Sequence, residues 1–265
     1  MDRRINLHTH CYRCKHASDN VRDYAEAAWN KDFTHLGMTD HVPLPDDWWS
    51  GIRMHMSEMD FYLKDIDEAR AEFPALRILS GFECDYYPEY EEYLESLYPR
   101  VNYLIGSVHS IRYKGKRRSI YDVPKCPETL QLYADLLCEA MASRLFRFIA
   151  HPDLFSVMIR RWNRDCEMIA RQIFETCKQY SSTLEINTSG YRKARGDSGD
   201  TLYYPIVDFW RVAGEYGVKV VVNSDAHTPE DVDADLDAGY ELASRFALPL
   251  DLFADLLKSD GTEKG

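Results

Sequence analysis

The chain of 265 residues is 45% hydrophobic and 29% charged, which is ordinary for a globular protein with a substantial buried core. Its net charge of -12 argues against a nucleic-acid partner, because binding to a duplex depends on Lys and Arg side chains that neutralise phosphates. The sequence has neither an apolar leader at its N-terminus nor an apolar run near the ~18 residues of a membrane span, so we expect a cytoplasmic protein without a membrane partner.

Short β-rich runs alternate with helical patterns along the chain. The seven runs are mostly continuous apolar stretches, which is typical of strands covered on both faces. They span residues 5–7, 35–39, 77–82, 103–108, 147–150, 183–187 and 218–223. The helical patterns span residues 21–32, 57–73, 127–144, 166–180, 204–216 and 229–246. This alternation predicts a parallel sheet.

The number of strand–helix units and the length of the chain favour an α/β barrel over an open doubly wound sheet. No G-x-G-x-x-G or G-x-x-x-x-G-K-[ST] motif indicates a nucleotide-binding sheet. The sequence also shows no internal repeat, low-complexity tract or Pro- or Ser-rich linker. We therefore expect a single domain over residues 1–265, of which about 258–265 form a flexible tail.

Ligand-type side chains stand where the predicted strands end. In chain order they are His8 and His10 with His16 close behind, Asp40 and His41, Glu83, His109, His151, Asn187, and Asp225 and His227. The i, i+2 spacing of His8 and His10 puts both imidazoles on the same side of an extended strand, and Asp225 and His227 repeat that spacing. Because the carboxyl ends of barrel strands form one rim, which carries the active site, these side chains are expected to meet. The pattern predicts a multinuclear metal site.

The donor types indicate the metals and the reaction. Imidazole nitrogens and carboxylate oxygens suit zinc, manganese or iron. The seven histidines with Glu83 and Asp225 make nine ligands, which are too many for one ion, so we expect two to three divalent metal ions per chain. Two ions ~3.5–4 Å apart clamp the attacking and leaving oxygens of a phosphoryl transfer and make hydroxide available near neutral pH. The predicted chemistry is hydrolysis.

The seven cysteines are an odd number scattered along the chain, which suits free thiols in a reducing compartment better than a disulfide framework. A C-x-x-C pair such as Cys11 and Cys14 can be redox-active or hold zinc. No second pair follows at a suitable spacing, and this one lies inside the first histidine cluster. We therefore interpret both thiols as bystanders.

Six successive motifs resemble those of the PHP (polymerase and histidinol phosphatase) superfamily, namely NLHTHCYRCKH, GMTDH, GFECD, IGSVHS, AHPDL and NSDAH. The stretches MTDHVPLPDDWW, RMHMSEMDFYL, LEINTSGYRK and NSDAHTPEDV are further similar to the histidinol-phosphate phosphatase branch. The resemblance covers nearly the whole chain. It implies a distorted (β/α)7 TIM-like barrel with its metal site at the C-terminal rim of the strands, which agrees with the seven runs.

The resemblance also implies a role for each ligand. It assigns His8, His10, Glu83 and Asp225 to one metal, Glu83, His109 and His151 to a second, and His16, His41 and His227 to a third. Among these, Glu83, Asp225 and His227 would act in catalysis. The implied reaction is phosphomonoester hydrolysis by a metal-bridging hydroxide, in which L-histidinol phosphate and water give L-histidinol and phosphate.

A phosphate group needs fixed cations, and arginine suits bidentate contacts. Arg53 and Arg192 match positions that are basic in the phosphatase branch. Arg160 and Arg161 follow the His151 motif and are further candidates. For each arginine the alternative is a solvated surface residue. The loop around residues 190–204 is longer than expected for this branch.

Three other functions are weighed against this one. The substrate could be another small phosphate ester, such as a nucleotide or a sugar phosphate, cleaved by a phosphatase or phosphodiesterase of the same superfamily. A non-catalytic metal-binding accessory module is disfavoured, because every expected ligand position is filled. An amidohydrolase-type C–N hydrolase would also use histidines on a barrel rim, but no lysine stands as an obvious metal bridge. The oligomeric state is left open.

Overall fold

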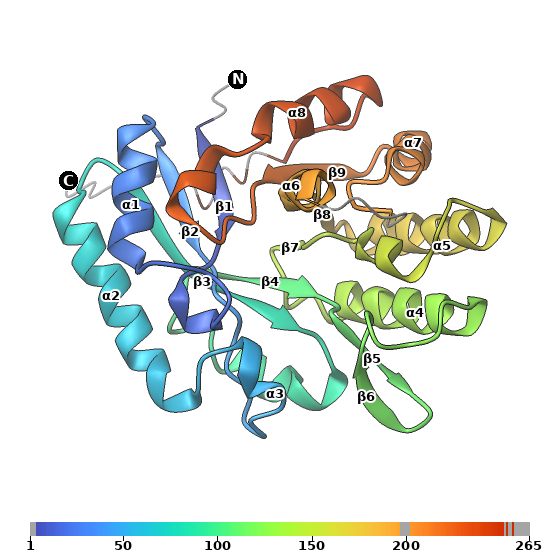
Figure 1. Cartoon of the computed structure of the whole chain (residues 1–265), viewed down its shortest axis with the longest axis horizontal. Helices are drawn as coiled ribbons and strands as arrows, with labels where there is room; N and C mark the ends of the chain where they lie inside the picture. Colours follow the sequence, from blue (N-terminus) through green and yellow to red (C-terminus); the bar gives the residue numbers. More distant parts are fainter. Residues whose placement is uncertain (1–3, 197–201, 252, 254–255, 257–265) are drawn as a thin grey trace, which may run out of the picture.

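A parallel sheet of seven strands surrounded by helices forms the centre of the molecule (Figure 1). The computed structural model describes residues 4–196, 202–251, 253 and 256, so the expected tail lies outside the described residues. The strands follow one another around the sheet in chain order: β1 (Ile5–Thr9), β2 (His35–Met38), β3 (Arg77–Asp85), β4 (Tyr103–Ser107), β7 (Phe148–Ile149), β8 (Thr183–Asn187) and β9 (Lys219–Asn223). All seven predicted runs are confirmed. β3 continues past its predicted end, so Glu83 lies within this strand.

Helices cover the outside of the sheet (Figure 1). They are α1 (Val21–Asn30), α2 (Met59–Glu72), α3 (Glu91–Glu95), α4 (Pro127–Ser143), α5 (Arg164–Tyr180), α6 (Ser189–Gly196), α7 (Val207–Tyr216) and α8 (Leu236–Arg245). The prediction of one helix over 229–246 is wrong. Pro229–Asp233 form a 3-10 helix instead, and α8 begins only at Leu236, because Asp235 adopts a left-handed φ of 60°. Within the described ranges, no helix has both the length and the apolar character needed to cross a membrane.

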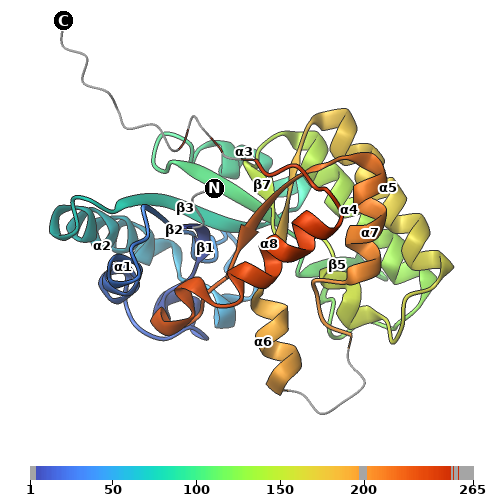
Figure 2. The same ribbon diagram turned by 90° about the horizontal axis from the view of Figure 1, so that it is seen from above.

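Two α-helices and a β-hairpin were not predicted. The short helices α3 and α6 follow strands whose downstream residues read as loops, and α6 stands off the body of the barrel (Figure 2). The basic stretch after β4 forms an antiparallel hairpin of β5 (Ser110–Tyr113) and β6 (Lys116–Ser119). The rim of the barrel therefore carries more regular structure than the sequence pattern indicates.

The first and last strands meet and nearly close the sheet into a barrel. The side-chain Oδ1 of Asn223, at the end of β9, accepts a hydrogen bond from Leu7 N at 2.8 Å. Just beyond the strand ends, His10 N donates to Ala226 O at 3.0 Å. An amide side chain thus takes up a backbone donor that a sheet edge would leave unpaired. Closure places the first histidine pair beside the residues that follow β9.

Apolar side chains fill both sides of the sheet. A small cluster inside the barrel joins residues of several strands, namely Leu7, Leu79, Tyr103, Ile105, Phe148 and Val221. A larger cluster joins the outer faces of the strands to the helices and includes the fully buried Phe82, Phe174 and Trp210. Burial on both faces is the reason that the strands read as continuous apolar runs.

A close contact inside the barrel gives a test of this packing. The hydroxyl of Tyr103 donates to Leu7 O at 2.6 Å by passing over Gly37 in β2, where an added Cβ would lie 2.0 Å from that hydroxyl oxygen. Gly37→Ala should therefore lower the free energy of unfolding by about 1–3 kcal/mol, the usual cost of overpacking a core. Urea denaturation measures this change. Gly51→Ala, where nothing lies within 4 Å of an added Cβ, is the matched control, and equal midpoints for the two variants would contradict the packing.

Candidate metal centre

The nine predicted ligands converge at the carboxyl ends of the strands. Eight lie in strands or within four residues of a strand end: His8, His10, His41, Glu83, His109, His151, Asp225 and His227. The ninth, His16, comes from the loop after the 3-10 helix Tyr12–Cys14. The ring centroid of His10 lies 4.3 Å from that of His227 and 4.6 Å from that of His41. The centroid of His16 lies 4.8 Å from that of His227. The structure brings all nine side chains together.

These side chains form overlapping groups of three, within which all ligand atoms lie within 4.8 Å of one another. Three of the groups are His8, His10 and Asp225; Glu83, His109 and His151; and His16, His41 and His227. The second and third groups have the same members as two of the ligand sets that the family resemblance implies, and the first lacks only Glu83 of the remaining set. Several sites for divalent metal ions are therefore present at this rim.

Glu83 stands between two of the groups. Its Oε2 lies 3.5 Å from the Nε2 atoms of both His8 and His10. Its Oε1 lies 2.8 Å from His151 Nε2 and 3.5 Å from His109 Nε2. Because the two carboxylate oxygens face different imidazoles, this side chain has the geometry of a bridge between two ions.

Unpaired buried atoms indicate that cations belong in the cluster. Asp225 Oδ1 and His41 Nδ1 are buried and have no hydrogen-bond partner among the described residues. Asp225 Oδ1 nevertheless lies 3.1 Å from His10 Nε2, and His41 Nδ1 lies 3.1 Å from Glu83 Oε2. A buried carboxylate is costly unless it is paired or coordinates a metal. The residues present therefore fit a group of divalent ions, which would use these free lone pairs.

The electrostatics of the cluster keep its carboxylates ionised. Burial opposes ionisation, but the neighbouring histidines hold the pKa values of Glu83 and Asp225 well below their usual range. Burial also lowers the pKa of His8, yet the carboxylates around it, Glu185 first, raise that pKa to about 10. The pKa of His41 is well below its usual range, because burial and the neighbouring imidazoles oppose a charge on the ring. Anionic carboxylates beside a neutral imidazole are the forms that bind metals.

Arg53 acts on the cluster from behind. Its side chain is buried, donates from Nη1 to Val42 O at 3.0 Å and pairs with Asp85 at 2.7 Å. Asp85 in turn accepts hydrogen bonds from the backbone N of His109 at 2.8 Å and from its Nδ1 at 3.1 Å. Burial opposes the charge on Asp85, but His109 and Arg53 lower its pKa. This series of hydrogen bonds leaves His109 Nε2 free to face Glu83, as is usual for metal-ligating histidines.

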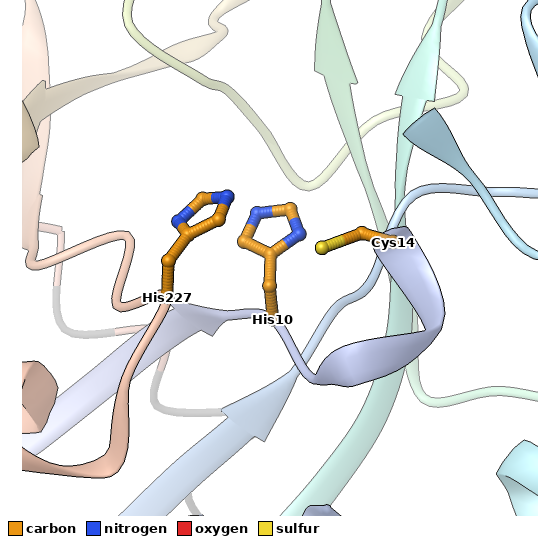
Figure 3. Close-up of side chains that lie close together, drawn as sticks. All are labelled: His10, Cys14 and His227. Atoms are coloured by element: carbon orange, nitrogen blue, oxygen red, sulfur yellow. The ribbon is translucent and has the colours of Figure 1, made fainter. Parts of the chain in front are cut away.

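A thiol that sequence analysis treats as a bystander lies against the cluster. Figure 3 shows the imidazole of His10 between that of His227 and the sulfur of Cys14, and the three ligand atoms lie within 4.8 Å of one another. Burial alone would raise the pKa of Cys14. Contacts with His10 and His16 lower this pKa by a larger amount, so the net shift is downward. Its partner Cys11 instead donates to Asp40 at 3.0 Å. Only the fold reveals which of the two thiols faces the histidines.

A cavity of about 580 Å³ opens above the metal ligands. Seven predicted ligands form part of its wall, and the other lining residues are Trp49, Ile52, Tyr121, Leu154, Ser189, Arg192, Lys193, Tyr204 and Asp231. The wall thus combines flat aromatic side chains, two cations and one carboxylate outside the cluster. A small organic molecule with an anionic group fits this chemistry.

The cationic side chains of the cavity come from α6. Arg192 donates to Ser224 O at 2.6 Å and to Asp225 O at 3.2 Å, and its Nε lies 3.1 Å from Asp231 Oδ2. Lys193, which sequence analysis missed, donates to the hydroxyl of Tyr204 at 2.7 Å. The segment that reads as a long loop therefore includes a helix that presents both residues to the cavity.

The structure places the other three predicted arginines elsewhere. Arg53 is turned away from the cavity by its pairing with Asp85. Arg160 and Arg161 are exposed and line a separate hollow with Lys125 and Asn163. They follow β7 at some distance, because the 3-10 helix Leu154–Met158 comes first and carries the chain away from the rim. Among the four, only Arg192 lies where it can face a ligand above the metals.

The fold and the donors together define a class of protein: a nearly closed parallel barrel with a multinuclear histidine and carboxylate centre at the carboxyl ends of its strands. Residues 6–189 match the model of the PHP domain family. The chain belongs to the PHP domain family, and the resemblance predicted from its motifs is confirmed.

Known proteins with similar sequences span most of this chain. A protein of Deinococcus radiodurans named "Probable histidinol-phosphatase" is 30% identical over 238 residues, which cover 85% of this chain and 86% of the relative. The histidinol-phosphatase of Bacillus subtilis is 26% identical over 259 residues, which cover 85% of this chain and 94% of the relative.

A solved structure shares the fold. The histidinol phosphate phosphatase of Lactococcus lactis, complexed with zinc, L-histidinol and phosphate, matches with a TM-score of 0.71 and 16% sequence identity. The match covers 93% of this chain and 94% of that chain.

The position of Glu83 leads to a prediction about metal content. Elemental analysis of protein purified without chelator should find at least two metal ions per chain. Glu83→Gln preserves the side-chain volume but removes the charge that holds two cations together, so the variant should retain at least one ion fewer. Glu72→Gln, which removes an exposed carboxylate paired with Arg22, is the matched control. A wild-type content of one ion or less, or equal contents in both variants, would contradict the bridge.

Proposed function

We propose that this protein is a metal-dependent phosphomonoester hydrolase that converts L-histidinol phosphate and water to L-histidinol and phosphate. One observation carries the proposal: Glu83 joins two histidine groups on the floor of a cavity whose wall holds Arg192 and Lys193. Such a site combines several cations with a place for an anionic ester. The names of the relatives support the choice of substrate.

The ligand groups would hold up to three ions. His8, His10 and Asp225 would hold one ion, Glu83, His109 and His151 a second, and His16, His41 and His227 a third. Bound divalent ions provide hydroxide near neutral pH and neutralise the charge of phosphoryl oxygens. The buried carboxylates and imidazoles contribute by holding those ions at fixed positions.

The cavity wall would orient the ester. Arg192 and Lys193 bring positive charge to the cavity wall, where a phosphoryl group needs it. The hydroxyl of Tyr121 lines the cavity and can donate a hydrogen bond to the substrate. Trp49 and Tyr204 offer apolar faces to a planar ring and help to exclude water.

A carboxylate in the wall favours histidinol phosphate over other esters. Asp231 lines the cavity but belongs to none of the ligand groups, and its side chain is one-third exposed. It can pair with the ammonium group of an amino alcohol, which nucleotides and sugar phosphates lack. The aromatic walls alone would accept a nucleobase as well as an imidazole, so nucleotides are the second candidate.

The remaining features are compatible with an enzyme of the cytoplasm. All seven cysteines are free thiols, as a reducing compartment maintains them. We therefore place the proposed reaction in the cytoplasm, with a small phosphate ester as the binding partner.

A phosphate-release screen with metal-reconstituted enzyme tests the substrate. L-Histidinol phosphate should give a kcat/KM at least about tenfold above those of nucleoside monophosphates and sugar phosphates, because a hydrogen bond to a charged group contributes roughly 1.5–3 kcal/mol. The nucleotide alternative would be favoured by a higher kcat/KM for any nucleoside monophosphate. If none of the esters releases phosphate, the proposed function is wrong.

A second prediction concerns the cation on the cavity wall. Arg192→Met should lower kcat/KM for L-histidinol phosphate by roughly 100- to 1000-fold, as expected when a preorganised group that stabilises developing charge is lost. The kcat/KM for an aryl phosphate should fall by as much if Arg192 contacts the phosphate group. It should fall by less if Arg192 faces the amino-alcohol part of the substrate. Arg195→Met is the matched control on the same helix, because Arg195 is exposed and pairs with Asp235. Similar activities in the two variants would exclude Arg192 from phosphate binding.

A further inference from the structure

A carboxylate below the metal ligands is not a ligand itself. Glu185 lies in the middle of β8 and is fully buried. It neither lines the cavity nor belongs to any of the groups that could hold a metal. A buried carboxylate without a cation needs hydrogen bonds to all of its lone pairs. The hydrogen-bond donors around Glu185 therefore indicate its structural role.

Four donors surround Glu185. Its Oε1 accepts from His8 Nδ1 and from Asn223 Nδ2, each at 2.8 Å. Its Oε2 accepts from the backbone N of His151 at 3.0 Å and from Asn187 Nδ2 at 2.8 Å. Two of these partners are predicted ligands of different ions. The carboxylate thus connects the His8 and His151 groups through hydrogen bonds.

The protein backbone dictates which way the two amides point. Asn223 Oδ1 accepts from Leu7 N at 2.8 Å, and Asn187 Oδ1 accepts from Ser189 N at 3.0 Å. Because a backbone N–H can only donate, each amide must turn its NH2 group toward Glu185. With three partners that can only donate, the carboxylate is held as an acceptor, and the fourth partner, His8 Nδ1, must carry its proton.

This proton decides what His8 can bind. When Nδ1 keeps its hydrogen, Nε2 is the nitrogen that can offer a lone pair to an ion, and Nε2 faces His10 Nε2 at 3.1 Å and Glu83 Oε2 at 3.5 Å. At the other oxygen, the bond to the N–H of His151 holds a residue whose φ of 30° is rarely adopted by L side chains. Both effects prepare ligands before any ion arrives.

We propose that Glu185 is a positioning residue that fixes the tautomer of His8 and ties the His8 and His151 groups together for metal binding. The inference rests on the metal dependence of the proposed function, but not on the identity of the substrate. A glutamine at this position cannot replace the carboxylate. Its amide NH2 would face either His8 Nδ1 and Asn223, or the N–H of His151 and Asn187, and would oppose donors in both orientations.

Zinc binding by the apoprotein tests the proposal without any substrate. Competition with a chromophoric chelator should show that Glu185→Gln weakens zinc binding by about 10- to 100-fold, the usual effect of losing a partner that orients a ligand. The control is Thr183→Val on the same strand, which removes a partly buried hydrogen bond of 2.7 Å to Asp251 at the end of the strand remote from the metal ligands. Thr183→Val should bind zinc as the wild type does.

Two results would overturn the proposal: zinc binding by folded Glu185→Gln within about twofold of the wild type, or an equal loss in Thr183→Val. Nitrogen-15 NMR of the imidazoles in the wild-type apoprotein gives a separate measurement, which also decides the matter if Glu185→Gln does not fold. It should find a proton on Nδ1 of His8, whether or not Nε2 also carries one, and a proton on Nε2 alone would refute the role of Glu185. A negative phosphate-release screen would reject the substrate without touching this result.

Discussion

The contact between the first and last strands is the constraint on which the metal centre depends. Its ligands come from both ends of the chain, so the centre exists only while β1 lies beside β9. That contact has no regular ladder of hydrogen bonds, and side chains such as Asn223 provide part of what the backbone lacks. The Nδ2 atom of the same asparagine donates a hydrogen bond to Glu185. Barrel closure and ligand orientation therefore share one network of buried polar groups.

This network also explains how so many ionisable groups are tolerated in a buried place. Carboxylates outside the ligand groups, such as Asp85 and Glu185, accept hydrogen bonds from the Nδ1 atoms of ligand histidines. The ligand carboxylates Glu83 and Asp225 instead face groups of ligand histidines, and Asp225 Oδ1 keeps a lone pair free for a cation. Buried acids thus divide into those that orient imidazoles and those that face the ions, and the polar groups of each kind suit their role.

Two arginines near the site, Arg192 and Arg53, differ in the groups that they contact. Arg192 donates to the carbonyl oxygens of Ser224 and Asp225 while its side chain lines the cavity, so it supports the segment that carries a metal ligand and brings charge to the substrate side. Arg53 supports His109 through Asp85 but is sealed in the interior. Both are basic residues in motifs near the site, and only their surroundings give them different tasks.

The sequence by itself determined the barrel class, the seven strands and the nine side chains that gather at the rim, because strand periodicity and the position of residues at strand ends are local properties. It also carried the family resemblance, since the motifs are contiguous. Only the tertiary structure decided that Glu185 lies beneath His8, that Cys14 faces His10, and that Arg192 and Lys193 reach the cavity while Arg160 and Arg161 do not. Such relations join residues far apart in the chain, and the direction of a side chain depends on packing and hydrogen bonds that no local pattern contains.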